Sequence, residues 1–536
     1  MHRTVTFLWV WLAGFACMAA GAAPAAALPG ELDPTFGSGG TVVTDLGAIE
    51  VITDVALQPD GKIVVAGSAT GRILVARYNP DGSLDPTFSD DGFVVTSFGM
   101  GAGGWSVALQ PDGKIVVAGS TSTGPGPQNL ALLRYNADGS LDASFDGDGM
   151  LFTDLGASEV STGIALGPSG NIVVSARNFS GDPEDLVTVR YGSDGSLDGT
   201  YGAGGVATTD LGGDERAESL VVEADGKVVV GGFIVGAGTA DLVVARYSAI
   251  GAPDPTFDGD GVAIADSGAF DIGFSLAAQN DGYLLGGLVA AGLNETPAIA
   301  RFTNGGALDP GFAGGGFTLL DLGPEGQAPV NLLTQPDDSV LFTPGTSDFE
   351  VGRLTPLGRL DPTFGTGGIA SVDFGADAAI NALALQPDGQ IVGAGFTSAG
   401  AEPENIALAR LGGGNRPTCR GHDATIEAVP GERTPGTLGD DVIVGTAGRD
   451  RINGGKGRDR ICALGKADKV NGGGGPDVAD GGKGRDTMRG AGGSDLLRGG
   501  AANDRLAGGG GRDTLVGGKG NRDRCAAGRG DRVRGC

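Results

Sequence analysis

Nine aspartates near the C-terminus repeat at intervals of nine residues, and carboxylates with this spacing can bind a metal ion. Each is followed two positions later by an apolar residue, from Ile443 after the first to Leu515 after the last. Stacked carboxylates repel one another unless a cation lies between them. Ca²⁺ accepts many oxygen ligands in flexible geometry, so it is the ion that this pattern favours. The series is Asp441, Asp450, Asp459, Asp468, Asp477, Asp486, Asp495, Asp504 and Asp513.

Glycine-rich turns precede most of these aspartates, in the pattern G-G-x-G-x-D-x-U-x, where U is apolar. Gly455, Gly457, Gly473 and Gly475 are the turn glycines that we predict to build the metal site together with the nine aspartates. Over about residues 438–536 the sequence resembles the haemolysin-type (RTX) calcium-binding repeats, which form parallel β-rolls. The resemblance implies that two nonapeptides make one coil and that aspartates 18 residues apart stack on one edge. It also implies that calcium binding drives folding of the roll.

Departures from the pattern leave an alternative open. Complete turns precede only Asp459, Asp477, Asp486 and Asp513, and the gap between the first two of these turns is the favoured calcium site. Four arginines stand directly before an aspartate, where they could neutralise it without a metal. The alternative is therefore a roll held partly by Arg–Asp pairs and disulfides. These arginines are Arg449, Arg458, Arg485 and Arg512.

A longer repeat organises the rest of the chain. The motif Leu-Asp-Pro-Thr-Phe or a close copy occurs seven times, and its closing aromatic residues lie 52 to 57 residues apart, from Phe36 to Phe364. Each unit contains about four short apolar or β-branched runs, and a Pro-Asp-Gly turn such as 59–61 separates two of them. Seven units of four strands predict an all-β fold with a seven-bladed β-propeller, followed by the parallel β-roll. An open solenoid is the competing architecture, and in a propeller both ends of the domain could complete one blade.

These units are similar to the delta-60 repeat, a bacterial extracellular propeller repeat. The resemblance covers about residues 30–411 and is close in copies one, two and seven, which keep segments like LDPTFG and LQPDGKIVVAG. The biochemical function of the family is generally unknown, so the resemblance implies a fold and an extracellular location but no reaction.

One arginine recurs in every copy, as does the aspartate of the motif. Seven identical residues indicate seven identical structural roles, and we expect each arginine to bond to a carboxylate or a turn carbonyl. No histidine is placed for base catalysis and no nucleophile motif is present, so the sequence does not predict an enzyme. The arginines are Arg77, Arg134, Arg190, Arg246, Arg301, Arg353 and Arg410.

The N-terminus is typical of an exported protein. A positive residue, an apolar stretch and an Ala-x-Ala site predict a signal peptide at residues 1–27, with lipidation of Cys17 as an alternative. The remaining four cysteines allow three pairings, of which proximity favours Cys419–Cys462 and Cys525–Cys536. We expect the propeller at residues 28–411, a linker at 412–440 and the roll at 441–536, with no transmembrane segment in the mature chain.

Charge is distributed unevenly along the chain. Residues from 416 onward hold 22 Lys and Arg against 16 Asp and Glu, a balance of +6, and the preceding residues have a balance of −34. An acidic body repels nucleic acid, and the alternating signs in the tail predict a solvated surface. The sequence thus predicts a secreted, non-enzymatic calcium-binding scaffold, adhesin-like, with an extracellular protein or cell surface as its partner. The alternative is an extracellular hydrolase or oxidoreductase with a pocket at the propeller axis.

Overall fold

The protein is built from β-strands, turns and loops, and the described residues contain no helix. The structure, a computed structural model, describes residues 27–536 except 99, 123–126, 180–183, 237, 292–293, 321, 323–330, 346–347, 399–403, 414–417, 421, 424–425, 429–432, 438, 447 and 521. Apart from Ala27, the predicted signal peptide and Cys17 lie outside these residues. Within the described part of the chain, no helix has the length and apolar character needed to cross a bilayer.

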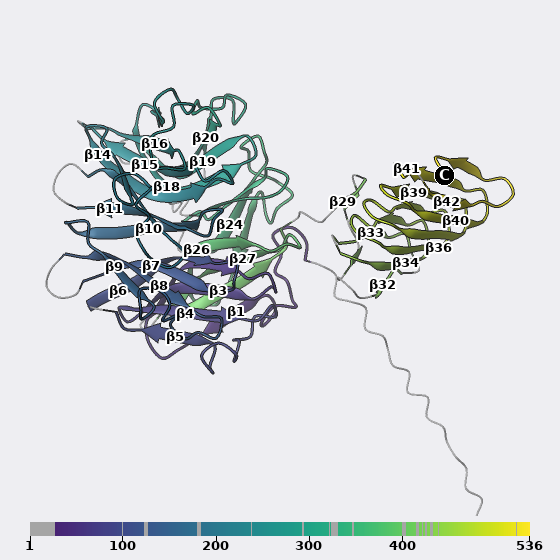
Figure 1. The fold of residues 1–536 in the computed structure, drawn as a ribbon, viewed down its shortest axis with the longest axis horizontal. Helices are drawn as coiled ribbons and strands as arrows, with labels where there is room; N and C mark the ends of the chain where they lie inside the picture. The colour runs from purple at the N-terminus through teal and green to yellow at the C-terminus, as the bar shows by residue number, and fades with distance from the viewer. Residues whose placement is uncertain are drawn as a thin grey trace, which may run out of the picture.

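The first 28 strands pair in antiparallel sets of four, one set for each copy of the long repeat (Figure 1). The first three sets comprise β2 (Glu50–Leu57), β3 (Ile63–Ala69), β4 (Arg72–Tyr78), β5 (Phe93–Thr96); β6 (Met100–Leu109), β7 (Ile115–Ser122), β8 (Asn129–Tyr135), β9 (Met150–Thr153); and β10 (Glu159–Leu166), β11 (Ile172–Asn178), β12 (Leu186–Tyr191), β13 (Val206–Thr209). The next three comprise β14 (Asp214–Val222), β15 (Val228–Val235), β16 (Ala240–Tyr247), β17 (Val262–Ala265); β18 (Phe270–Gln279), β19 (Gly282–Ala291), β20 (Asn294–Thr303), β21 (Phe317–Leu319); and β22 (Leu332–Thr334), β23 (Val340–Phe342), β24 (Phe349–Leu354), β25 (Ile369–Val372). The last comprises β26 (Asp377–Leu385), β27 (Ile391–Ser398), β28 (Asn405–Leu411) and β1 (Thr41–Thr44).

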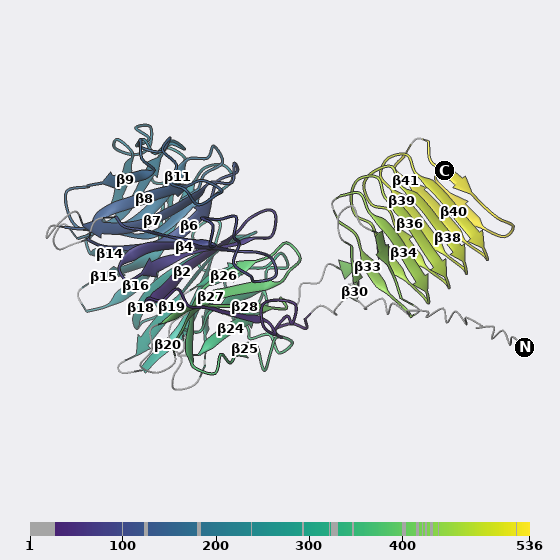
Figure 2. The ribbon, with the colours of Figure 1, turned by 90° about the horizontal axis from the view of Figure 1, so that it is seen from below.

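The first strands of successive sets contact one another in a closed ring. The contacts run from β2 through β6, β10, β14, β18 and β22 to β26, which contacts β2 again. These strands therefore surround the centre of the domain, and the other strands of each set lie farther out, as in a propeller (Figures 1 and 2). The structure has seven strand sets, and the prediction that each of them is one blade of a seven-bladed propeller stays a prediction.

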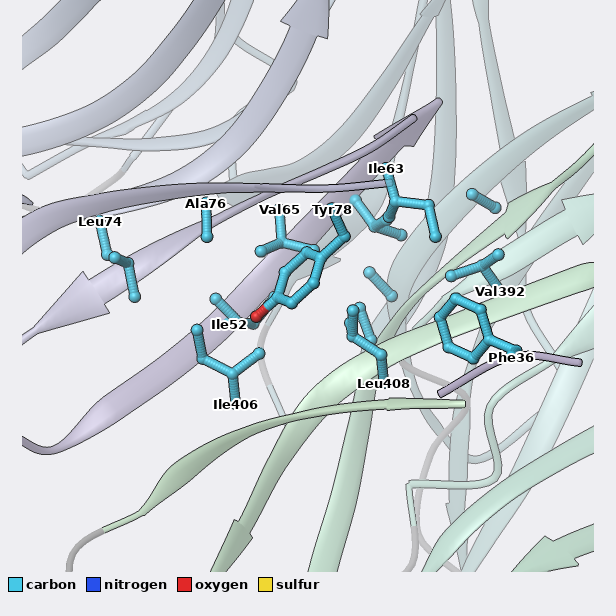
Figure 3. Close-up of a cluster of buried hydrophobic side chains, with 14 of the residues drawn as sticks. Phe36, Ile52, Ile63, Val65, Leu74, Ala76, Tyr78, Val392, Ile406 and Leu408 are labelled. Carbon is cyan, nitrogen blue, oxygen red and sulfur yellow. The ribbon is translucent and has the colours of Figure 1, made fainter. Parts of the chain in front are cut away.

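The last set closes the ring with a strand from the other end of the domain. β1 pairs antiparallel with β28, with Thr41 opposite Ala409, so the prediction that both ends complete one blade is confirmed. Apolar side chains from β2–β4 and from β26–β28 pack into one buried cluster at this junction (Figure 3). Phe36, Tyr78 and Leu408 in this cluster are fully buried, and burying side chains of this size contributes about 1.5–3 kcal/mol each.

Each recurring arginine joins two neighbouring sets through a polar clasp. Arg134 Nε donates to Asp142 Oδ2 at 2.7 Å, Nη2 donates to Ser144 Oγ at 3.0 Å, and Nη1 donates to the backbone oxygen of Ser193 in the next copy. The guanidinium lies over the Phe145 ring, 4.6 Å from its centroid. The structural role predicted for the arginines is thereby confirmed. The other pairs are Arg77–Asp85, Arg190–Asp198, Arg246–Asp254, Arg301–Asp309, Arg353–Asp361 and Arg410–Asp33.

The C-terminal region forms a parallel β-roll with two ladders of strands (Figure 2). One ladder contains β31 (Ile426–Glu427), β33 (Val442–Val444), β35 (Arg460–Cys462), β37 (Val478–Asp480), β39 (Leu496–Gly500), β41 (Thr514–Gly518) and β43 (Arg532–Arg534). The other contains β32 (Arg433–Pro435), β34 (Arg451–Lys456), β36 (Lys469–Gly474), β38 (Thr487–Gly492), β40 (Arg505–Gly510) and β42 (Arg524–Ala526). A separate short hairpin consists of β29 (Thr418–Cys419) and β30 (His422–Asp423).

The ladders reach into the segment assigned to the linker. β31 and β32 pair with β33 and β34, although both lie within residues 412–440. Ile426, opposite Ile443, packs against the row of apolar residues that fills the roll. This first coil lacks the Asp and Gly pattern, which is why the sequence does not reveal it.

Candidate metal centre

Two columns of aspartates run along the two edges of the roll. In each column the backbone N–H of one aspartate donates to Oδ1 of the aspartate in the next coil, at 2.8 to 3.0 Å. The spacing of 18 residues is therefore the repeat of the structure. One column contains Asp441, Asp459, Asp477, Asp495, Asp513 and Asp531. The other contains Asp450, Asp468, Asp486, Asp504 and Asp523.

The second oxygen of most of these carboxylates has no partner. The Oδ2 atoms of Asp459, Asp468, Asp477, Asp486, Asp495, Asp504, Asp513 and Asp523 are buried and accept no hydrogen bond. The side chains themselves are at most 9% exposed. A buried charged oxygen without a partner costs several kcal/mol. Rows of such oxygens fit a cation with oxygen ligands, and Ca²⁺ is such a cation.

Crowding of these carboxylates changes their acidity. Burial, followed by the charges of Asp459 and Asp495, raises the pKa of Asp477 to about 7 against one backbone hydrogen bond that lowers it. Burial and the charges of Asp486 and Asp450 likewise raise the pKa of Asp468 to about 7. The columns therefore hold carboxylates that resist ionisation unless a positive charge compensates them.

Glycines are required where successive loops stack closely. Gly455, Gly457, Gly473 and Gly475 have φ between 102° and 125°, a region that favours glycine. A Cβ on Gly473 would lie 2.1 Å from the backbone oxygen of Gly455, and one on Gly475 would clash with Gly457 in the same way. Loop carbonyls thus point at the following loop, and the four predicted glycines are brought together between the turns of Asp459 and Asp477.

Two loops depart from the pattern at the start of the roll. Thr437 N–H donates to Asp441 Oδ2 at 2.7 Å, and Thr446 N–H donates to Asp450 Oδ2 at 2.7 Å. Both carboxylates are therefore satisfied by their own loop, unlike those from Asp459 to Asp523. Of the nine predicted aspartates, these two have the least need of a cation.

Later irregularities preserve the columns. Before Asp468, Leu464 and Lys466 adopt positive φ values of 67° and 62° in place of glycine. After Asp513 the extra residue in the loop before Asp523 shifts the spacing to 19, yet Asp504 N–H still donates to Asp523 Oδ1 at 2.8 Å. Asp523 and Asp531 thus extend the columns beyond the predicted set. The sequence signals them only as aspartates that follow the slip in the period.

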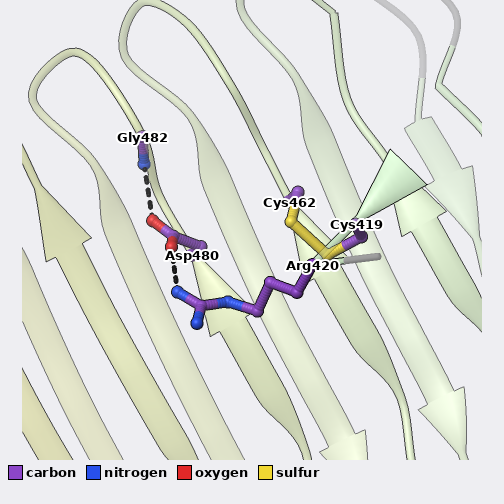
Figure 4. Close-up of a disulfide and its surroundings, with 5 residues drawn as sticks. All are labelled: Cys419, Arg420, Cys462, Asp480 and Gly482. Atoms are coloured by element: carbon purple, nitrogen blue, oxygen red, sulfur yellow. Dashed lines mark hydrogen bonds and ion pairs between the residues drawn. A yellow bond between two sulfur atoms is a disulfide. The ribbon is translucent and has the colours of Figure 1, made fainter. Parts of the chain in front are cut away.

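Arginines do not neutralise the columns. Among the described residues, no ion pair joins Arg449, Arg458, Arg485 or Arg512 to the aspartate that follows it. The one ion pair within the described part of the roll is Arg420–Asp480, and Asp480 does not belong to either column (Figure 4). The alternative in which arginine replaces the cation therefore finds no support in these contacts.

Two disulfides fasten the ends of the roll. Cys419 bonds to Cys462 and Cys525 bonds to Cys536, which confirms the favoured pairing. Beside the first, the Arg420 guanidinium pairs with Asp480, whose Oδ1 accepts a hydrogen bond from Gly482 N–H at 3.2 Å (Figure 4). The segment before the roll is thereby fixed to its first coils.

Family comparisons agree with this geometry. The profile of the RTX calcium-binding nonapeptide repeat (4 copies) matches residues 435–465, 463–497 and 489–523. The profile of a domain of unknown function (DUF5122) β-propeller matches residues 58–88, 110–145 and 223–257. The chain carries RTX calcium-binding repeats after delta-60-type propeller repeats. The third propeller match lies in copy four rather than in copy seven. No curated protein matches the chain.

Several solved structures resemble about two thirds of the chain. Virginiamycin B lyase from Staphylococcus aureus, crystallised with quinupristin as an inactive variant, is 12% identical with a TM-score of 0.43, covering 69% of this chain and 98% of the lyase. Polysaccharide lyase Uly1 is 11% identical with a TM-score of 0.41, covering 67% of this chain and 89% of the other. YCF48 from Cyanidioschyzon merolae is 13% identical with a TM-score of 0.38, covering 69% and 99%. These likenesses concern the fold alone.

Proposed function

We propose that the RTX repeats bind calcium ions between consecutive loops of each edge and that this binding completes the folding of the roll. The observation that carries the proposal is the row of buried Asp Oδ2 atoms that accept no hydrogen bond. The ligands of the ions would be the predicted aspartates from Asp459 to Asp513 and the backbone of Gly455, Gly457, Gly473 and Gly475. A bound Ca²⁺ would supply the positive charge that the columns lack.

We further propose that the protein is a secreted scaffold in which the propeller is a rigid binding or display module. The two disulfides support an oxidising, extracellular environment. A folding step driven by calcium suits a chain that leaves a compartment of low calcium for one of high calcium. The seven clasps and the closed ring of inner strands support rigidity, and an adhesin-like partner would be an extracellular protein or cell surface.

One pocket of the described structure lies away from the propeller axis. A cavity of about 1020 Å³ is lined by Leu28–Glu31, by residues of β24 and β25, and by the loop around Thr363. None of its lining residues belongs to the inner strands of the ring. An extracellular enzyme that uses a pocket at the propeller axis stays the alternative proposal.

Hydrogen exchange of the full chain tests the calcium proposal. Peptides from the roll should exchange rapidly in EGTA and become protected cooperatively as Ca²⁺ is added, whereas propeller peptides serve as an internal reference. Equal protection of the roll in EGTA and in saturating Ca²⁺ would contradict the proposal. Direct counting of bound Ca²⁺ by equilibrium dialysis would then show whether the ion binds without ordering the roll.

A further inference from the structure

Three carboxylates from different strands meet where the third and fourth strand sets of the propeller join. Leu186 of β12 lies opposite Thr209 of β13, so Asp185 and Asp210 flank the last pair of this ladder. β14 begins beside them, because Glu215 N–H donates to the backbone oxygen of Glu184 at 2.8 Å. One carboxylate oxygen from each of Asp185, Asp210 and Glu215 lies within 4.8 Å of the others.

The buried member of this group has an oxygen without a partner. Glu215 is 0% exposed, and its Oε1 accepts a hydrogen bond from Gly213 N–H at 2.7 Å. Its Oε2 is buried and accepts none. Asp210 Oδ1 accepts a hydrogen bond from Gly212 N–H at 2.8 Å, which fixes the second carboxylate on the loop between β13 and β14.

Nearby cations are engaged elsewhere. Arg216 pairs with Asp214 at 2.9 Å, and Arg177 pairs with Glu184 at 3.4 Å. Among the described residues, no ion pair involves Asp185, Asp210 or Glu215. Three negative groups therefore converge without compensation, and their mutual repulsion is strong because one of them is fully buried.

The same arrangement recurs 56 residues later at the next junction. Asp241, Asp266 and Asp271 occupy the three positions, again with oxygens within 4.8 Å of one another. Asp271 is 0% exposed, and Asp241 Oδ1 is buried without a hydrogen bond. The unpartnered oxygen at this junction is therefore on the first residue, because both oxygens of Asp271 accept hydrogen bonds from Ser267.

Other junctions place neutral groups at the first of these positions. The corresponding residues are Asn405, Asp45 and Glu50 at one junction and Asn129, Asp154 and Glu159 at another. The backbone geometry is shared, because the N–H of Glu50 and of Glu159 also donates to a carbonyl just before the third strand of the preceding strand set. Glu50 and Glu159 also have a buried Oε2 that accepts no hydrogen bond, so the two triad junctions differ from these by their additional carboxylate.

We propose that these two junctions each bind a divalent cation of the calcium type, in sites separate from the RTX repeats. Three carboxylates and no nitrogen or sulfur ligand suit a hard cation, and flexible geometry suits Ca²⁺ better than Mg²⁺. The cation would be held by β12, the end of β13 and the start of β14 at one junction. It would thereby tie the third strand set to the fourth, and its counterpart would tie the fourth to the fifth.

Sensitised Tb³⁺ luminescence of the full chain can separate these sites from those of the roll. All six tyrosines lie in the propeller, and residues 412–536 contain no Trp, Tyr or Phe. Tyr247 Oη donates to Thr209 Oγ1 at 2.8 Å, directly beside Asp210. Excitation of tyrosine should therefore transfer energy to Tb³⁺ at the first junction, whereas Tb³⁺ in the roll stays dark.

We expect saturable emission from the native chain that Ca²⁺ displaces. The double variant Asp185→Asn, Asp210→Asn should lose most of this emission, whereas Asp146→Asn, an exposed control, should keep it. Tyr247→Phe should lose the emission but keep a calcium-dependent rise in the Tm of the propeller, which the double variant should lack. The proposal would be overturned if the native chain gave no emission. It would also be overturned if the emission persisted in the double variant or in Tyr247→Phe.

Discussion

Replacing Arg134 with alanine tests the clasp that joins the strand sets of the propeller. The change removes the 2.7 Å bond from Nε to Asp142 Oδ2, the bond to Ser144 and the bond to the next copy at Ser193. Asp142 is 6% exposed, so it would keep a buried charge. Removing one partner of a buried ion pair costs about 3–5 kcal/mol.

The structure places the expected loss at the lower end of that range. Lys114 Nζ lies 2.8 Å from the same Asp142 oxygen, so the carboxylate would keep one cation. We therefore expect a loss of about 3 kcal/mol. Roughly 380 residues unfolding together have an entropy of unfolding of about 0.8 kcal/mol/K, so the Tm should fall by about 4 °C.

The assay is thermal unfolding in excess Ca²⁺, followed by the near-ultraviolet signal of the tyrosines, all of which lie in the propeller. Arg72→Ala is the matched control, because Arg72 is exposed on β4 and surface changes usually stay within about 0.5 kcal/mol. Arg134→Lys should give an intermediate Tm, since lysine keeps the charge but loses the forked contacts. A Tm of Arg134→Ala equal to that of Arg72→Ala would refute the reasoning.

Three further predictions concern the roll. Because burial and neighbouring charges raise the pKa of Asp468 and Asp477 to about 7, the folded roll binds more protons than the unfolded chain at mildly acidic pH. Without metal, its stability should therefore increase from about pH 8 to about pH 5, and hydrogen-exchange protection factors that fail to rise would contradict this. Asp477→Asn removes a buried charge, so protection should increase in EGTA while the gain on adding Ca²⁺ shrinks; Asp146→Asn should change neither. Replacing Cys419 and Cys462 with serine opens a loop of 43 residues and should lower the free energy of unfolding of the roll by about 4 kcal/mol. The loss should appear as faster hydrogen exchange in β33 and β35 than in β39. Equal rates would argue against a structural role for this disulfide.

The sequence predicts those features that repeat at a fixed period. The interval of nine marks the aspartates as one set, and the resemblance to RTX repeats implies that residues 18 apart stack on one edge. The seven Arg residues likewise reveal their shared role through their recurrence. The period does not reveal which group each carboxylate oxygen binds. In the structure Oδ1 accepts a hydrogen bond from a backbone N–H of the preceding coil, and this bond depends on the distance between stacked coils.

Features that depend on assembly escape the sequence. Asp185, Asp210 and Glu215 lie in separate segments and meet only when two strand sets pack together. The alternating charges of the tail predict a solvated surface, but the structure separates the two signs of charge. The column aspartates turn inward and are buried, whereas Arg451 and Arg505 of the second ladder face solvent. Charges that alternate along the sequence are thus separated by the coiling of the roll, which buries the column aspartates and leaves these arginines exposed.

Closure of the propeller by β1 has a consequence for the order in which the chain can fold. Asp33 and its partner Arg410 are 377 residues apart, and β1 pairs with β28 over a similar separation. A chain synthesised from its N-terminus therefore carries an unpaired edge strand until nearly the whole domain has been made. The roll behaves in the opposite way, because each coil needs only the one before it. The propeller is thus completed in a single late event, whereas the roll is extended one coil at a time after it.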